Sequence, residues 1–530
     1  MSKKVKLTIH PKFQIGQIDP RLFSGYLEPM GNLINPSLYD PAHPTANAAG
    51  FRQDYIDVLK QSGLPAVRLP GGNFVSGWDW KDSIGPKEQR RKHLDLAWHQ
   101  YYSNDVGHDE YLQWAEQSNF EPLYTINLGT GDINDAIYIA EYTNHEGGTY
   151  WSDLRRKNGH EKPYGVKMWY LGNEVDGPWQ VGSWERDPRG YGVRANEVSK
   201  AMKWVDGSIE TAACVSCSPC LNHYPDWDRQ VLEQCYESVD YISLHHYQNV
   251  RPDHPTWMLG SAIYFEDYIN TEIALCDYIQ TKCRSPKKMM LSFDEYGVIP
   301  HPQAEKLYYG SGPHNIYRLF QDLSYRPYIT GGFTFTGERF HHGELPAALC
   351  SASVIMTFLR HADRVKIGCM TGGLGALISC DKEHFWHSAS YYTFSSFIKY
   401  AKGVSLRVGV DCDTFDIPGF AANDHDQYAD RQGIPYIDAA AAYDELNGTV
   451  NLFVINRYAD EDKTAEIDCT GFAGYRLVEH LQMHTDDLND YNTWEEEKLN
   501  MKVNPETTFE NGVVKTNLKA YSWNVFRFAK

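Results

Sequence analysis

Short apolar runs alternate with amphipathic stretches from about residue 20 to residue 403. The stretch 51–62 repeats apolar residues at the spacing of one helix face, and Gly63 follows as a stop signal. Apolar runs that are bounded by turn residues indicate buried strands. Eight strands that alternate with helices predict an α/β fold, a (β/α)8 TIM barrel. The predicted strands are Leu22–Leu27, Ala66–Leu69, Pro122–Asn127, Lys167–Leu171, Ala212–Ser216, Tyr241–Leu244, Lys288–Phe293 and Arg364–Cys369.

After Gly403 the pattern changes to short alternating strands that are separated by turn residues. Examples are TVNLFVIN, TAEIDCTG, YRLVEHLQM and YSWNVFRF, and no helical stretch lies between them. This pattern predicts a C-terminal all-β sandwich over residues 404–530. The opening run KVKLTIH also alternates. We therefore expect residues 1–20 to add a strand to that sandwich and residues 21–403 to form the barrel.

The charge balance narrows the classes of partner. The net charge is −19 over 530 residues, whereas nucleic acid and anionic membranes need a basic surface. No run reaches about 18 apolar residues, so we expect no membrane-spanning helix. The N-terminus lacks the apolar segment of a signal peptide. We expect an intracellular protein if Met1 is native, and a secreted one if a signal was removed.

Neither the cysteines nor the histidines predict a metal site. The cysteine cluster in TAACVSCSPC has no fourth ligand nearby, so buried thiols are the favoured interpretation. The segment RFHHGELP brings His341, His342 and Glu344 together, and an exposed loop is favoured for the same reason. We expect no metal and no cofactor.

Two glutamates follow apolar runs of the predicted barrel. Glu174 ends the run KMWYLGNE, and Glu295 ends KKMMLSFDE. Catalytic groups of such barrels come from the carboxyl ends of the strands. A pair of carboxyl groups at one mouth is the minimal equipment for breaking a glycosidic bond. The alternative for a single glutamate is a hydrogen bond to the backbone of the following loop.

The surroundings of the two glutamates predict different roles. A general acid must keep its proton near neutral pH, and Trp169, Trp179 and a second carboxylate would raise the pKa of Glu174. The nucleophile must stay ionised and therefore needs donors. His245 and Tyr247 lie two apart on one strand face and are candidate donors to Glu295, and Arg68 is a third candidate. A retaining pair of this kind has carboxyl groups about 5–5.5 Å apart.

Arg68 and Asn73 belong to the segment AVRLPGGNFVSGWDW, whose Pro-Gly-Gly turn allows the backbone to approach closely. An arginine that points into a barrel mouth needs an acidic partner, because an isolated buried charge is costly. We expect Glu28, at the end of LFSGYLE, to be that partner. A purely structural ion pair below the site is the alternative.

These segments together resemble glycoside hydrolase family 51, the retaining α-L-arabinofuranosidases. The similarity covers nearly the whole chain. The segments that carry it are PKFQIGQIDPRLFSGYLE, VRLPGGNFVSGWDWKDSIGP, LDLAWH, YLGNEVDGPWQ, DYISLHHY, SFDEYGV, HADRVKIGC, FVINR and SWNVFR. LGNE alone is not specific, but LGNE together with VRLPGGNFVSGW is. Family 39 lies in the same clan of barrel glycosidases.

The resemblance implies roles for single residues. Glu174 would be the general acid/base and Glu295 the nucleophile, and Trp98 would form a wall where the aglycone leaves. The hydroxyl groups of the terminal sugar would be held by Glu28, Arg68, Asn73, Asn173 and Tyr247. The substrate would be an oligo- or polysaccharide that contains arabinose. Family members often form hexamers, so a homo-oligomer is expected as well.

Two segments depart from the family pattern. The family has Trp-Asn after the nucleophile, and this chain has Tyr296-Gly297. Where the family has a glutamine that touches the sugar, this chain has the run from Thr371 to Gly375. Both changes remove side chain, so we expect a roomier sugar pocket with relaxed or unusual arabinosyl specificity. A clan relative of other specificity (β-xylosidase, β-galactosidase or endoglucanase) and a non-catalytic sugar-binding protein remain the alternatives.

Overall fold

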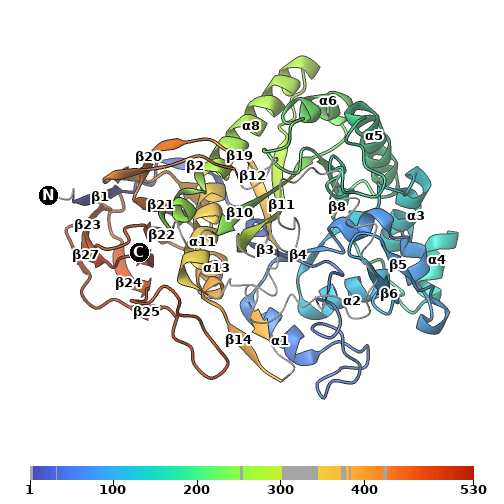
Figure 1. The fold of residues 1–530 in the computed structure, drawn as a ribbon, viewed down its shortest axis with the longest axis horizontal. Helices are drawn as coiled ribbons and strands as arrows, with labels where there is room; N and C mark the ends of the chain where they lie inside the picture. Colours follow the sequence, from blue (N-terminus) through green and yellow to red (C-terminus); the bar gives the residue numbers. More distant parts are fainter. Residues whose placement is uncertain are drawn as a thin grey trace.

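The computed structural model describes residues 4–31, 33–250, 255–300, 344–371, 378–380, 383–421 and 427–530. His341, His342 and Gly372–Gly375 lie outside these ranges. Eight parallel strands close a barrel, which confirms the predicted fold class (Figure 1). Its strands are β3 (Ser24–Tyr26), β4 (Ala66–Leu69), β7 (Glu121–Ile126), β8 (Met168–Leu171), β9 (Glu210–Cys214), β10 (Tyr241–Val250), β11 (Met290–Pro300) and β12 (Val365–Met370).

Every predicted barrel strand overlaps an observed one, but β10 and β11 extend well beyond their predicted ends. β10 and β11 stay paired from Tyr241 opposite Met290 to Val250 opposite Pro300. Glu295 therefore lies within β11 and not at its tip, which corrects the sequence interpretation. Cross-strand hydrogen bonds continue past the apolar run, so the polar residues that follow it remain extended.

Helices pack around the barrel, with α3, α5, α6 and α8 on its outer side (Figure 1). α1 ends at Ser62, as predicted, because Gly63 takes the left-handed conformation and its N–H bonds to the carbonyl of Lys60. The described helices are α1 (Gln53–Ser62), α2 (His108–Ser118), α3 (Ile133–Asn144), α4 (Tyr150–Lys157), α5 (Pro188–Val205), α6 (Asp226–Cys235), α7 (Pro255–Gly260), α8 (Ile263–Cys283), α11 (Leu345–Arg360) and α13 (Ala389–Tyr400). No helix in the described ranges is long and apolar enough to cross a membrane.

The C-terminal domain consists of two main sheets, which confirms the predicted β domain. The first has the order β16 (Gly409–Asp411), β1 (Val5–Thr8), β23 (Lys463–Asp468), β27 (Val513–Leu518) and β26 (Thr508–Glu510). The second has the order β2 (Gln14–Gln17), β15 (Val404–Leu406), β21 (Ile437–Asp444), β22 (Thr449–Asn456), β28 (Ser522–Ala529), β24 (Arg476–Met483) and β25 (Lys502–Val503). β1 and β2, from the start of the chain, thus hydrogen-bond to strands that follow the barrel.

α11 and α13 lie between the barrel and the β domain (Figure 1). The ring of Phe397 on α13 packs 4.8 Å from Phe453 and 5.2 Å from Trp523 of the large sheet. These large buried rings join the two domains into one apolar core. Because closely packed interiors leave little free space for side chains to move, this contact holds the barrel firmly on the sheet.

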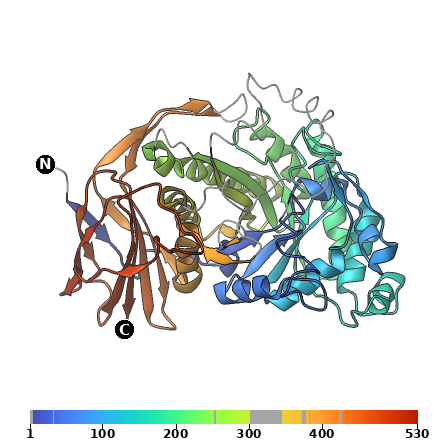
Figure 2. The ribbon, with the colours of Figure 1, turned by 60° about the horizontal axis from the view of Figure 1, so that its bottom comes forward.

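An extension of the β domain arches over the barrel (Figure 2, orange). It consists of the paired strands β17 (Thr414–Ile417) and β20 (Arg431–Pro435). The paired strands β18 (Phe420–Ala421) and β19 (Gln427–Tyr428) lie between them in the chain. Phe415 and Ile434 pack against Trp257 beside the barrel. Tyr428 donates a hydrogen bond of 3.3 Å to the backbone carbonyl of Tyr247 on β10. The extension therefore reaches the strand that carries the predicted site residues.

Candidate active site

Glu174 lies in the loop that follows β8, at the mouth of the barrel. Its φ is +43°, in the left-handed region that non-glycine residues rarely adopt. Its carboxyl group contacts Nδ1 of His245 at 3.0 Å and accepts a hydrogen bond of 2.8 Å from Nε1 of Trp179. The unusual backbone therefore turns this side chain toward β10.

Glu295 is 5% exposed and faces the same space from β11. Its carboxylate accepts hydrogen bonds of 2.7 Å from Nη1 of Arg68 and 2.7 Å from the hydroxyl of Tyr247. The pairing of β10 with β11 shifts by one residue between Ser243 and His245. Such a bulge re-aims side chains, so that Asp294 and Glu295 both point into the barrel although they are neighbours in the chain.

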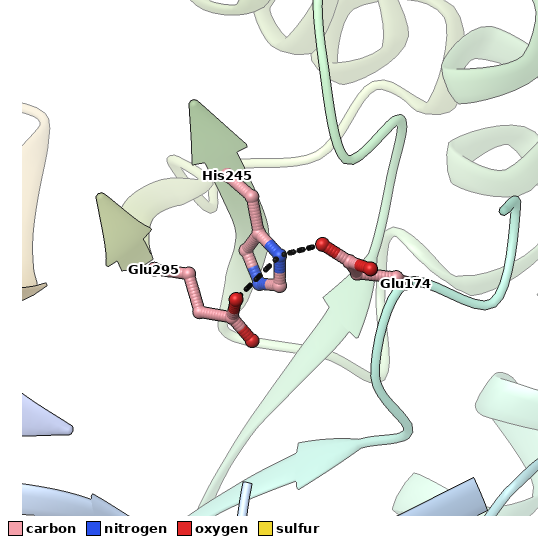
Figure 3. A group of neighbouring side chains, drawn as sticks. All are labelled: Glu174, His245 and Glu295. Atoms are coloured by element: carbon pink, nitrogen blue, oxygen red, sulfur yellow. Dashed lines mark hydrogen bonds and ion pairs between the residues drawn. The ribbon is translucent and has the colours of Figure 1, made fainter. Parts of the chain in front are cut away.

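His245 lies between the two glutamates (Figure 3). Nδ1 is 3.0 Å from Glu174 and 3.7 Å from Glu295, and Nε2 is 3.3 Å from Asp294. One oxygen of each glutamate and one nitrogen of His245 all lie within 4.8 Å of one another. The structure thus brings together two carboxyl groups that are far apart in the sequence.

Burial and charge shift the pKa values of this group. Burial, followed by the negative charge of Glu295, raises the pKa of Glu174, although His245 and Trp179 oppose the shift. Burial by itself would lower the pKa of His245, but the carboxylates of Glu295, Asp294 and Glu174 outweigh it and raise the value to about 10. Glu174 is therefore suited to hold a proton, and His245 to hold a positive charge, near neutral pH.

Arg68 is fully buried, and its predicted role as a donor to Glu295 is confirmed, whereas its predicted pairing with Glu28 is wrong. Its Nε lies 2.9 Å from Asp294, its Nη1 bonds to Glu295, and its Nη2 donates a hydrogen bond of 2.8 Å to Asn173. Glu28 is not among its ion-pair partners within the described residues. The bulge in β11 places the carboxylates of both Asp294 and Glu295 beside the guanidinium group.

Glu28 is held by neutral donors instead. It accepts hydrogen bonds of 2.8 Å from the hydroxyl of Tyr26, 2.9 Å from the backbone N–H of Phe74 and 2.7 Å from Nε1 of Trp98. Burial, followed by the charge of Glu295, raises its pKa to about 8. Glu28 and Trp98 are thus brought together at the mouth, as a hydrogen-bonded pair.

The two predicted asparagines are also adjacent. Nδ2 of Asn173 donates a hydrogen bond of 3.0 Å to Oδ1 of Asn73, which also accepts one from Gln180. Seven of the nine predicted site residues therefore lie in one network of hydrogen bonds and ion pairs. The pair of Glu28 and Trp98 adjoins it through Tyr26, whose ring lies 5.5 Å from the guanidinium carbon of Arg68. The roles that the resemblance implied for them remain proposals.

Three further members of the network were not predicted as site residues. Asp294 binds Arg68 and His245, Gln180 bonds to Asn73, and Tyr26 bonds to Glu28. Gln180 follows Trp179 in the segment GNEVDGPWQ, so its nearness to Glu174 was a usable signal. Asp294 gave no such signal, because strand alternation alone would turn it away from Glu295.

The structure corrects the expectation for Tyr296. This side chain is fully buried, and its ring lies 5.1 Å from Phe358 of α11, on the face of β11 opposite to Glu295. Its identity therefore does not enlarge the sugar pocket. Gly297 faces the site: a Cβ atom placed there would lie 3.6 Å from the ring of Tyr247. The hydroxyl oxygen of Tyr247 also lies 2.9 Å from the hydroxyl oxygen of Thr371.

The spacing of Glu174, His245 and Glu295 would also suit a metal ion. The charges favour another assignment, because the guanidinium group of Arg68 bonds to Glu295 and His245 already lies between the carboxyl groups. A divalent cation would have to displace a proton and face two neighbouring cations. We therefore assign the three side chains to an ion-paired network.

Comparison with known proteins places this site in a family. The family described as alpha-L-arabinofuranosidase 1 domain matches residues 58–269, and the alpha-L-arabinofuranosidase C-terminal domain matches residues 294–522. The chain is 35% identical over 532 residues to the intracellular exo-α-(1→5)-L-arabinofuranosidase 1 of Bacillus subtilis, covering 100% of this chain and 99% of the relative. This chain belongs to the α-L-arabinofuranosidases of glycoside hydrolase family 51.

Other relatives agree with this membership. The chain is 31% identical to an exo-α-(1→6)-L-arabinofuranosidase of Bifidobacterium longum, over 98% of this chain and 96% of the relative. A solved family 51 α-L-arabinofuranosidase from the same organism superposes with a TM-score of 0.86 at 29% identity and covers 100% of both chains. The resemblance found in the sequence is confirmed over the full length, so the chain is a glycoside hydrolase that acts on arabinose-containing substrates.

Proposed function

We propose that this protein is a retaining exo-α-L-arabinofuranosidase, with Glu295 as nucleophile and Glu174 as general acid/base. The observation that carries the proposal is the meeting of these carboxyl groups, within 4.8 Å, around His245. Inverting enzymes separate their carboxyl groups by about 6.5–9.5 Å to leave room for a water molecule. An approach of one oxygen from each carboxyl group to within 4.8 Å favours the closer, retaining arrangement, in which a carboxylate attacks the anomeric carbon directly.

In the first step, the ionised carboxylate of Glu295 attacks the anomeric carbon of a terminal arabinofuranosyl unit. The proton of Glu174 passes to the glycosidic oxygen, and the aglycone leaves as an alcohol. Arg68 and Tyr247 support this step, because their hydrogen bonds of 2.7 Å favour the ionised form of Glu295 and orient it.

In the second step, Glu174 is ionised and acts as a general base. It removes a proton from a water molecule, which attacks the anomeric carbon and releases Glu295. The two inversions at this carbon leave the configuration of the sugar unchanged. His245 stays hydrogen-bonded to Glu174 and compensates part of the charge that appears there.

The remaining predicted residues would hold the terminal sugar. Asn73, Asn173 and Glu28 present polar groups at the mouth, and we assign them to the sugar hydroxyl groups. Trp98 is held through its Nε1 to Glu28 and would form the wall toward the aglycone. A sugar-facing residue that is fixed by such bonds loses little entropy on binding.

The linkage is the finer part of the proposal. One relative is described as acting on α-(1→5) bonds and another on α-(1→6) bonds, at similar identities of 35% and 31%. We propose release of terminal α-L-arabinofuranosyl residues from arabino-oligosaccharides, with (1→5) as the first linkage to test. The family resemblance also supports a homo-oligomer, which light scattering of the purified protein tests.

A covalent probe tests the mechanism. An arabinofuranose-configured cyclitol aziridine should label Glu295, as identified by peptide mass spectrometry, and Glu295→Gln should abolish labelling. Glu174→Gln should slow hydrolysis of arabinobiose about 100- to 10,000-fold, the usual range for loss of an acid/base group. Its effect should be smaller on the 4-nitrophenyl arabinofuranoside, whose leaving group needs no proton. Preferential labelling by a xylose- or galactose-configured probe would contradict the proposal.

A further inference from the structure

Asp294 precedes the proposed nucleophile but is fully buried, so substrate cannot reach it. Its contacts are made through Oδ2. This oxygen accepts a hydrogen bond of 2.9 Å from Ser243 and lies 2.9 Å from Nε of Arg68 and 3.3 Å from Nε2 of His245. One carboxylate oxygen thus binds both cations of the network.

Each of these cations binds a proposed catalytic glutamate through another nitrogen. Arg68 reaches Glu295 through Nη1 at 2.7 Å, and His245 reaches Glu174 through Nδ1 at 3.0 Å. Guanidinium and imidazolium groups are planar and rigid. Fixing one nitrogen of such a group therefore sets the direction of the others.

We infer that Asp294 is a positioning residue for the double displacement: it anchors Arg68 and His245 from below and so aims them at Glu295 and Glu174. The inference rests on the proposed function, because it takes these two glutamates as the reacting groups. Asp294 also keeps His245 as an imidazolium, in which both ring nitrogens donate. Nε2–H then faces Asp294 while Nδ1–H faces Glu174.

The charges around Asp294 and Glu174 predict how the pKa of Glu174 would change if Asp294 lost its charge. The titratable groups that face Asp294 are Arg68 on β4, Tyr170 on β8, Cys214 on β9, His245 on β10 and Cys369 on β12. Glu174 faces His245, Glu295, Tyr247 and Cys217 together with Trp179. Without the negative charge of Asp294, the two cations act on Glu174 uncompensated and lower its pKa, and the pKa of His245 falls as well.

Asp294→Asn tests the inference because it keeps the size of the side chain and removes the charge. We expect kcat to fall about 100-fold, as displaced catalytic groups commonly cause, with KM nearly unchanged. The alkaline limb of the pH profile of kcat/KM should move to lower pH. In isotope-labelled protein, the nitrogen resonances of His245 should titrate at lower pH than in the wild type. Ser243→Ala removes one bond to Asp294 and no charge, so its pH profile should match the wild type.

The chain offers a matched control in Asp438. This aspartate is also buried and paired with arginine, but it belongs to β21 and faces α11, away from the mouth. Asp438→Asn should lower stability and leave the pH profile unchanged. An Asp294→Asn profile that superposes on the wild type would overturn the inference, as would a loss of activity that merely follows unfolding.

Covalent labelling separates this test from the test of function. If the aziridine probe labels Glu295 in both the wild type and Asp294→Asn, and the pH profile does not move, only the role of Asp294 is wrong. If the probe labels another residue in the wild type, the proposed function itself fails.

Discussion

Two buried ion clusters of this protein resemble each other in composition but differ in their balance of charge. The mouth cluster contains the cations Arg68 and His245 and the carboxyl groups of Glu28, Glu174, Asp294 and Glu295. The interface cluster contains Asp438, which bonds to Arg457 at 2.5 Å, Arg360 at 2.8 Å and Ser353 at 2.5 Å. Acid is in excess at the mouth, whereas at the interface the single carboxylate of Asp438 faces two arginines.

The pKa values follow this balance. Burial favours the protonated form of Asp438, but Arg457 and Arg360 outweigh it and hold the pKa below its usual value. At the mouth, burial and neighbouring carboxylates raise the pKa values of Glu28 and Glu174. A structural cluster satisfies its charges, whereas a catalytic cluster keeps a carboxyl group in the state that the reaction needs. A buried arginine alone therefore does not identify an active site.

The strongest contrast should come from removing the two arginines. We expect Arg68→Met to reduce kcat/KM about 100- to 1,000-fold, the usual loss when one preorganised donor to a reacting group is removed. Steady-state kinetics of the purified variant and of the wild type measure this loss. Retention of activity within tenfold would show that Arg68 is only structural.

At the interface cluster we expect the loss of an arginine to lower stability and to leave activity unchanged. Arg457→Met leaves Asp438 with fewer donors in a buried place, and we expect a loss of about 3 kcal/mol in the free energy of unfolding. Urea unfolding measures the loss, and kcat of the folded fraction should be unchanged. A large drop in kcat at unchanged stability would mean that this interface acts on the mouth.

The two clusters should also respond to pH in opposite directions. The folded-state pKa of Asp438 is lowered, so its contribution to stability is present above its unfolded value, about 4, and is lost as the pH falls. The folded-state pKa of His245 is raised to about 10, so its contribution is complete below about 6.5 and is lost as the pH rises toward 10. The free energy of unfolding of each variant should be measured across pH and compared with that of the wild type. Asp438→Asn should approach the wild type at acid pH, and His245→Gln should approach it at alkaline pH.

The smallest effect concerns a third buried group, outside both clusters. Asp228 on α6 and Glu272 on α8 face each other. Burial, followed by the negative charge of Asp228, raises the pKa of Glu272 well above its usual value. Burial also raises the pKa of Asp228, to about 7. The folded state holds more protons than the unfolded state, so this pair costs stability as the pH rises. Glu272→Gln should be more stable than the wild type by about 1 kcal/mol at pH 8 and equal to it at pH 4. An equal difference in the free energy of unfolding at pH 4 and pH 8 would contradict the raised pKa of Glu272.

Several features followed from the sequence alone. The eight strand segments were visible because a strand covered on both faces is a continuous apolar run between turn residues. Glu174 and Glu295 were visible because each carboxylate closes such a run. Arg68 was visible as a charge that could not stay unpaired in an apolar strand.

Only the tertiary structure decided which groups pair. The extra residue in β11 opposite Ser243 and His245 turned Asp294 inward. It thereby gave Arg68 a second carboxylate partner beside Glu295, and Glu28 was left to Tyr26 and Trp98. It also set Tyr296 against α11 instead of the sugar site. A sequence fixes the period of a strand, but a bulge depends on how neighbouring strands pair, and that pairing involves residues that are far apart along the chain.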